Sequence, residues 1–380
     1  MKAGIFTIVD YRNYGNRLQN YALQEFLKSM GMEVETVLHD DYYDYKYTDK
    51  YIMNLPKHLL KSVLWRVIDI FAHDKHAMGY IWQSDILDKE RIKKNIALTN
   101  KYIEESNYIV REGNKKEKKL NQYDYCIAGS DQIWNPTLPG NASDFYFLQN
   151  VPFEKRIAFA ASVACDDIPD DRKKQWIKYV GEMNYISVRE KKAQLLIKKY
   201  TGKKSEKILD PTLLIDVNKY YRMMESHPTE LPEKYIATYV LGEFDGEQDK
   251  ALKKMADIND CEIIQLNNKK YRDTYLFDFI DFLNCINQAK FVITDSFHAC
   301  VFSILFSKPF AVIKRKGKYG DMYSRIDDLL ETFGLENHAC DSINTDMRLD
   351  SLNKEFIDQT IAIEKHKAIE YIYNIIESNN

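Results

Sequence analysis

Short apolar runs alternate with segments of helical periodicity along most of this 380-residue chain. Apolar runs such as residues 4–9, 33–39, 262–266 and 310–313 have the length of strands, and a helical pattern at residues 17–30 stands between the first two. This alternation is typical of an α/β fold built on parallel sheets. Because 380 residues are many for one hydrophobic core, we predict two Rossmann-like domains that face a cleft.

Breaks in the alternation predict the domain boundaries. A connection that contains three prolines, residues 210–232, separates a first domain at residues 1–215 from a second at 216–350. Residues 351–380 hold a last helix that is long enough to pack back on the first domain. Residues 51–97 have helical spacing and are predicted to be a helical insertion in the first domain, which packs on the core or makes a peripheral membrane contact.

Charge and composition exclude several classes of protein. A net charge of −3 and a pI near 6.3 argue against nucleic acid as a partner. No segment approaches the ~20 apolar residues that span a bilayer, and the first apolar run, which ends at Asp10, is too short for a signal peptide. The six cysteines form no Cys-x-x-Cys pair and fit buried free thiols. We therefore expect a soluble, cytoplasmic protein.

Motifs for cofactors and metals are missing from the sequence. It contains no Gly-x-Gly-x-x-Gly, no Walker A sequence, no His-Glu-x-x-His and no Asp-x-Asp. We therefore expect no tightly bound cofactor and no metal.

The stretch at residues 289–310 predicts a ligand site. An apolar run, residues 291–293, stops at the polar cluster 294–298, and an apolar helical pattern follows. Open parallel sheets bind ligands where a strand ends and the next helix begins, and the N-terminus of that helix favours anions. His298 would add a titrating group to such an anion site. The alternative is that Ser296 merely caps the helix and His298 is a surface imidazole.

Four polar segments follow predicted strands, in the order 14–23 (YGNRLQNYAL), 129–135 (GSDQIWN), 187–190 (SVRE) and 294–298 (TDSFH). In this combination and order the chain resembles the polysaccharide pyruvyl transferase family. The resemblance implies a GT-B-like fold with the acceptor on the first domain and the donor on the second. It also implies transfer of pyruvate from phosphoenolpyruvate to hydroxyl groups of a surface polysaccharide or its lipid-linked precursor, which leaves a ketal and inorganic phosphate.

This reaction needs groups that give and take protons, and cations that hold a carboxylate and a phosphate. His298 matches the histidine of the family's C-terminal motif and would be catalytic. Arg189 would be the fork-shaped anion clamp, unless it merely pairs with Glu190 or Asp210 on the surface. Arg325 either completes the anion site or pairs with Asp327 and Asp328.

Four further residues complete the predicted site. Asp131 would be a catalytic base or an acceptor-binding carboxylate, or else a helix cap. Trp134 would stack on a sugar face or fill the domain interface. Asn16, also a plausible helix N-cap, and Gln19 would order the first loop and reach the acceptor.

One position departs from the family. Characterised members often carry an arginine two residues before the histidine, where this chain has Ser296, which we include as a substrate-binding residue. Either the donor is not phosphoenolpyruvate, or the missing cation is one of Arg189, Lys314, Arg315 and Arg325. Two alternatives stay open: a GT-B glycosyltransferase whose Lys314 and Arg315 hold a nucleotide sugar with the His298 helix, and a catalytically silent glycan-binding relative.

Overall fold

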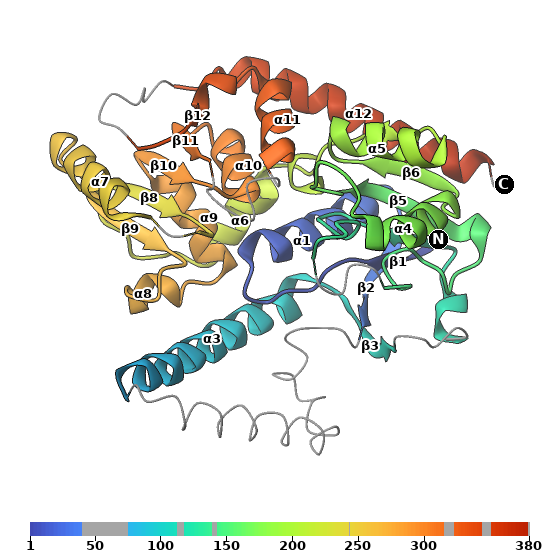
Figure 1. Cartoon of the computed structure of the whole chain (residues 1–380), viewed down its shortest axis with the longest axis horizontal. Coiled ribbons are helices and arrows are strands. Elements are labelled where there is room, and N and C mark those ends of the chain that lie inside the picture. Colours follow the sequence, from blue (N-terminus) through green and yellow to red (C-terminus); the bar gives the residue numbers. More distant parts are fainter. Residues whose placement is uncertain are drawn as a thin grey trace.

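The structure analysed is a computed structural model of the whole chain. It describes residues 1–39, 75–111, 118–138, 143–242, 244–314, 323–343 and 351–378. Figure 1 shows two α/β halves side by side.

The first half is built on a seven-stranded sheet in which all neighbouring strands are parallel. The strand order is β3-β2-β1-β4-β5-β6-β7. The strands are β1 (Lys2–Phe6), β2 (Glu33–His39), β3 (Glu105–Val110), β4 (Tyr125–Ala128), β5 (Arg156–Ala161), β6 (Tyr185–Val188) and β7 (Glu206–Lys207). The helices of this half are α1 (Tyr14–Ser29), α3 (Lys75–Tyr102), α4 (Asp170–Gly181) and α5 (Lys191–Thr201).

The second half is built on a five-stranded parallel sheet of order β12-β11-β10-β8-β9. Its strands are β8 (Tyr235–Tyr239), β9 (Glu262–Leu266), β10 (Phe291–Thr294), β11 (Phe310–Ile313) and β12 (Ala339–Cys340). The helices from the connection onward are α6 (Asn218–Glu225), α7 (Gly246–Ile258), α8 (Arg272–Tyr275), α9 (Phe279–Gln288), α10 (Phe297–Leu305), α11 (Ser324–Phe333) and α12 (Lys354–Ser378).

This architecture confirms the predicted fold of two parallel-sheet α/β halves. The predicted strands 33–39, 262–266 and 310–313 have the bounds of β2, β9 and β11. Helix α3 confirms helical structure in the later part of the predicted insertion, whereas residues 51–74 lie outside the described residues. The strand β3 was not predicted, because its sequence mixes polar and apolar residues at the edge of the sheet.

Helix α12 runs from the second half back over the first (Figure 1). The Tyr371 hydroxyl donates to the carbonyl of Ala158 in β5 (3.0 Å), and the hydroxyls of Tyr185 and Ser378 lie 2.9 Å apart. The last helix thus fastens the end of the chain to the first sheet.

The start of α1 joins the two halves through an aromatic cluster. The ring of Tyr14 stacks on Phe282 of α9 at 5.3 Å and lies 5.6 Å from Tyr239 of β8. Its hydroxyl donates to the carbonyl of Phe277 (2.8 Å). One continuous hydrophobic core therefore includes side chains of both sheets.

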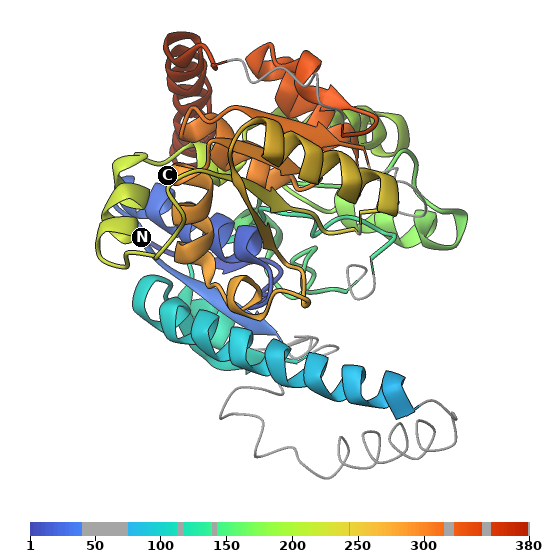
Figure 2. The same cartoon turned by 90° about the vertical axis from the view of Figure 1, so that its left-hand side faces the viewer.

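Helix α3 forms a second link between the halves, and Figures 1 and 2 both place it along one side of the molecule. Arg91 Nη1 donates to Asn267 Oδ1 (3.0 Å), and Asn95 Oδ1 accepts from the backbone N–H of Phe279 (3.0 Å). Helix α3 is therefore joined to the second half by one part-buried and one buried hydrogen bond.

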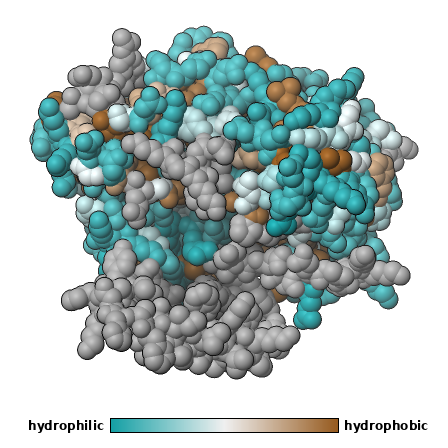
Figure 3. All heavy atoms as spheres, in the orientation of Figure 1, coloured by the Kyte–Doolittle hydropathy of each residue, from teal (hydrophilic) through white to brown (hydrophobic). Residues whose placement is uncertain are grey.

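Described side chains on the face in Figure 3 are mostly hydrophilic, with apolar ones scattered among them. Within the described ranges, no helix combines the length and the hydropathy that a bilayer-spanning segment requires. The peripheral membrane contact through the insertion stays a prediction.

The domain contact can be tested at Gly15, the second residue of α1. A Cβ atom there would lie 2.3 Å from Cγ and Nδ1 of His298, which is buried and cannot move aside cheaply. We expect Gly15→Ala to lower the free energy of unfolding by about 1–3 kcal/mol, the usual cost of overpacking. Thermal denaturation would measure it.

Gly181→Ala is the matched control, because a Cβ atom at the end of α4 would meet nothing within 4 Å. Its melting temperature should stay near that of the wild type. Equal melting temperatures for the two variants would contradict the close contact between α1 and α10.

Candidate active site

Chain segments from both sheets meet at the predicted site. Asp131 follows β4, Arg189 follows β6, and His298 lies in the first turn of α10, directly after β10. These positions are at the carboxyl ends of parallel strands, as the sequence predicted. All three side chains are buried.

Asp210 connects these residues, and the sequence had suggested it only as a surface partner of Arg189. Its Oδ2 accepts a hydrogen bond from Arg189 Nη1 and lies 3.8 Å from His298 Nε2. Its Oδ1 accepts from the backbone N–H (3.1 Å) and the hydroxyl (2.7 Å) of Thr212. A polar residue after a short strand was the available signal, but no strand was predicted at residues 206–207.

Arg189 is a buried cation rather than a surface one, with an exposed fraction of only 3%. Its guanidinium carbon lies 4.3 Å above the ring of Phe297, and its Nη2 lies 3.6 Å from Asp131 Oδ1. Within the described residues, its Nε and Nη2 groups have no hydrogen-bond acceptor. Arg189 therefore has buried N–H groups without acceptors in the described part of the chain, while Asp210 and Asp131 compensate its charge.

His298 is held in an environment that favours the neutral imidazole. Burial is the largest effect and lowers the pKa of His298 below its ordinary 6.5, and the charges of Arg189 and Arg325 act in the same direction. The carboxylates of Asp210 and Asp131 oppose this shift without reversing it. His298 Nε2 has no hydrogen-bond partner in the described part of the chain.

Asp131 lies in a turn, with a backbone φ of 68°. No helix begins there among the described residues, so the helix-cap alternative is wrong. Its Oδ2 accepts from Asn16 Nδ2 (3.0 Å), and its Oδ1 accepts from the backbone N–H of Gln132 (2.9 Å). Burial opposes ionisation, but nearby Arg189, His298 and Arg325, with the Asn16 hydrogen bond, lower the pKa of Asp131.

Arg325, at the start of α11, lies on the same aromatic ring as Arg189. Its guanidinium carbon is 5.6 Å from the centre of the Phe297 ring. When the Gln132 amide oxygen faces it, that oxygen lies 2.8 and 3.1 Å from the two terminal nitrogens of Arg325. Two arginines thus lie near the ring of Phe297, the residue that follows Ser296.

The other candidate cations are placed differently. Lys314 is half-exposed and lies 3.3 Å from Asp341, and Arg315 lies outside the described residues. Asp328, a suggested partner of Arg325, lies 2.8 Å from Lys207 instead.

Asn16 and Gln19 order the first loop. Asn16 Nδ2 donates to the carbonyl of Ile8 (2.9 Å) as well as to Asp131, and Asn16 Oδ1 accepts from the backbone N–H of Asp10 (2.9 Å). The helix N-cap is Asn13, not Asn16. Gln19 is fully buried and donates to the hydroxyl of Thr7 (3.1 Å). Asn16 thus reaches the site through Asp131.

Trp134 does not occupy the place expected for it. It is fully buried in the core of the first half, stacks on Phe147 at 5.6 Å, and donates its indole N–H to the carbonyl of Tyr146 (3.1 Å). The side chain is therefore unavailable to a sugar and does not fill the domain interface. The turn at Asp131 directs the following segment into the core, which the sequence pattern did not reveal.

Ser296 stands at the N-cap position of α10, but its side chain makes no capping hydrogen bond. Its backbone N–H donates to the hydroxyl of Thr294 (3.0 Å). The serine is buried.

One cluster of metal-ligand type occurs in the described part of the chain. His227, Asp278 and Asp281 bring ligand atoms within 4.8 Å of one another. Both aspartates also form the capping box of α9. None of the predicted site residues belongs to this cluster.

Several solved structures have a similar fold. A candidate UDP-N-acetylglucosamine 2-epimerase from Listeria monocytogenes is 13% identical, with 100% of this chain and 97% of that chain covered and a TM-score of 0.50. The UDP-GlcNAc 2-epimerase from Neisseria meningitidis bound to UDP-GlcNAc is 9% identical, with coverages of 98% and 100% and a TM-score of 0.47. ADP-heptose LPS heptosyltransferase II from E. coli is 9% identical, with coverages of 97% and 99% and a TM-score of 0.37. At these identities the similarity concerns the fold, which is GT-B-like.

No curated protein matches the chain significantly in sequence. The sequence model of the family described as Polysaccharide pyruvyl transferase matches residues 13–317, which include all four strand-end segments. A match over well over half of the 380 residues is decisive, and the chain belongs to the polysaccharide pyruvyl transferase family.

Proposed function

We propose that this protein transfers the pyruvate skeleton of phosphoenolpyruvate to two hydroxyl groups of one sugar, in a surface polysaccharide or its lipid-linked precursor. The product is a pyruvate ketal, and inorganic phosphate is released. Membership of the family supports this reaction class, and the chemistry of the buried site supports the donor.

The observation that carries the proposal is a set of buried nitrogen atoms without partners. Nε and Nη2 of Arg189 and Nε2 of His298 all lack hydrogen-bond partners within the described residues. Buried polar groups are almost always hydrogen-bonded, so such a set points to a ligand. An arginine fork matches a carboxylate or a phosphate, and phosphoenolpyruvate carries both.

The proton balance of the reaction suits a single histidine. The methylene carbon of phosphoenolpyruvate gains one proton, and the cationic C2 is attacked by the first hydroxyl, which loses one. Departure of phosphate and attack by the second hydroxyl complete the ketal, and that second proton leaves with the phosphate. Protonated His298 would give its proton to the methylene carbon, and the neutral imidazole that remains would accept the proton of the attacking hydroxyl, which restores the acid.

The carboxylates have a different role. The pKa of Asp131 and that of Asp210 are both lowered, since nearby cations outweigh the opposing effect of burial. Both groups are therefore ionised at neutral pH and are unable to donate a proton. Asp131 would stabilise the cationic C2, and Asp210 would hold His298 and Arg189 in place.

The domain assignment follows from this arrangement. The first domain, residues 1–215, would carry the acceptor near Asp131, and the second, residues 216–350, would bring His298 and Arg325 to the donor. Residues 351–380 would act as a fastening helix.

A donor screen tests the function. We expect phosphoenolpyruvate to raise the melting temperature, because a ligand at about 100 times its Kd stabilises a protein by ~2.7 kcal/mol. Nucleotide sugars are the other arm, because the similar epimerases carry UDP-GlcNAc in their names. A shift with UDP-sugars alone would favour a glycosyltransferase, and a shift with neither class would favour a silent glycan-binding relative.

His298→Ala should keep the fold and reduce turnover by roughly 10²–10⁴-fold, the usual contribution of a general acid–base group. In the wild type, kcat/KM should fall as pH rises through a value below about 6.5, because the pKa of His298 is lowered and the protonated imidazole is needed for the first step. The variant should lose this pH dependence. Turnover and a pH profile like those of the wild type would remove His298 from the mechanism.

Arg189→Lys should weaken the binding of phosphoenolpyruvate more than that of the acceptor, because an ammonium cannot form two parallel hydrogen bonds. Separate KM values for donor and acceptor measure this difference. Lys192→Gln is the control, since Lys192 lies near the surface, 3.7 Å from Asp166, and should leave both values unchanged. An equal rise in both KM values would contradict a donor clamp.

A further inference from the structure

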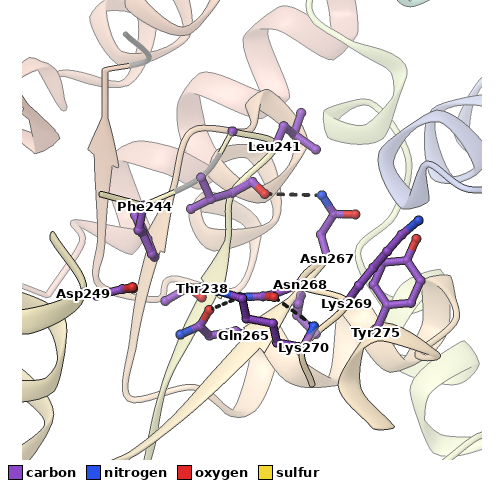
Figure 4. Close-up of a pocket in the computed structure, with 13 residues that line it drawn as sticks. Thr238, Leu241, Phe244, Asp249, Gln265, Asn267, Asn268, Lys269, Lys270 and Tyr275 are labelled. Carbon is purple, nitrogen blue, oxygen red and sulfur yellow. Dashed lines mark hydrogen bonds between the residues drawn. The ribbon is translucent and has the colours of Figure 1, made fainter. Parts of the chain in front are cut away.

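A separate cavity of about 350 Å³ opens at the carboxyl ends of β8 and β9 (Figure 4). Its volume is at the small end of the ~300–1,000 Å³ range of small-molecule sites. None of the residues that we predicted for the active site lines it.

The cavity shares a wall with the catalytic segment. The backbone N–H groups of Leu241 and Gly242, which line the cavity, donate to the Asp295 carboxylate at 2.7 and 3.1 Å. Asp295 precedes His298 by three residues, and β8 lies directly between β10 and β9. The cavity and the first turn of α10 therefore lie at neighbouring strand ends of the same sheet.

The lining is rich in neutral hydrogen-bonding groups and contains two aromatic rings. Thr238 and the amides of Gln265, Asn267 and Asn268 lie between Phe244 on one side and Tyr275 on the other (Figure 4). Amides both donate and accept, as hydroxyl groups require, and a ring offers an apolar face.

These amides are held in place before any ligand binds. Asn268 Nδ2 donates to Gln265 Oε1 (2.7 Å), and Asn267 Nδ2 donates to the carbonyl of Val240 (3.3 Å), as Figure 4 shows. Asn267 Oδ1 accepts from the buried Arg91 (3.0 Å). Such pre-organisation reduces the entropy lost on binding.

The charges of the lining argue against a phosphate ligand. Lys269 lies 2.8 Å from Asp88 of α3, so its charge is already compensated. Lys270 and Asp249 also line the cavity, and their charges cancel. The cavity therefore differs from the arginine-rich site at His298, where an anion is favoured.

We propose that this cavity binds a neutral sugar unit of the acceptor glycan, adjacent to the sugar whose hydroxyls react. The inference rests on the proposed function for the identity of the glycan. Because the cavity lies at the strand ends next to β10, a glycan would place one sugar unit in the cavity and a neighbouring unit towards His298. The site thus selects acceptors by a sugar that is not itself modified.

Direct binding tests the proposal without any turnover. Saturation-transfer NMR would be recorded with methyl glycosides of glucose, galactose, mannose and N-acetylglucosamine, and with uridine diphosphate. We expect at least one glycoside to bind the wild type, and Asn268→Ala or Gln265→Ala to weaken it roughly 5–30-fold, as lost hydrogen bonds do. Asn259→Ala is the control. It removes an amide at the end of α7 that does not line the cavity, and it should leave binding unchanged.

Lys270→Gln separates sugar from phosphate. Glycoside binding should stay within about twofold of the wild type, because a neutral sugar needs no cation. The proposal would be overturned if the wild type bound uridine diphosphate and Lys270→Gln abolished that binding. It would also be overturned if neither Asn268→Ala nor Gln265→Ala altered glycoside binding. Glycoside binding without pyruvyl transfer would contradict the proposed function alone. Pyruvyl transfer with an unchanged acceptor KM in both Asn268→Ala and Gln265→Ala would contradict this inference alone.

Discussion

The carboxylate of Asp210 holds the centre of the structure together. It accepts from Arg189 and Thr212 and lies 3.8 Å from His298, so it joins the end of the first sheet to the first turn of α10. A buried charge of this kind costs several kcal/mol in lost hydration unless its partners are well placed. The two halves must therefore meet at this group in one arrangement, and the contacts of Tyr14 and Gly15 maintain that arrangement.

Two guanidinium groups and two carboxylates nearly cancel in charge around His298. Burial then becomes the largest influence on the imidazole and keeps it neutral. An anionic ligand gains little from net charge in such a site. It gains most from the N–H groups of Arg189 that Asp131 and Asp210 leave without acceptors. Directed hydrogen bonds, rather than a strong field, are the basis of donor recognition in our proposal.

The sequence predicted the alternation of strands and helices well, because apolar periodicity reports which residues face a core. It also predicted that His298, Arg189 and Asp131 share one site, because the carboxyl ends of parallel strands lie at the same edge of a sheet. It missed Asp210, whose importance depends on how two halves meet, and misplaced Trp134, whose direction depends on a turn with positive φ. Local pattern does not contain either kind of information.

Because the site is assembled from both sheets, it exists only while the halves are together. Any separation would pull His298 away from Asp210 and Arg189, and each would then face water. In the proposed reaction, activation of the donor would thus coincide with exclusion of solvent, so that a hydroxyl of the sugar and not a water molecule meets the cationic carbon. The contact between the halves would then protect the reactive intermediate from hydrolysis.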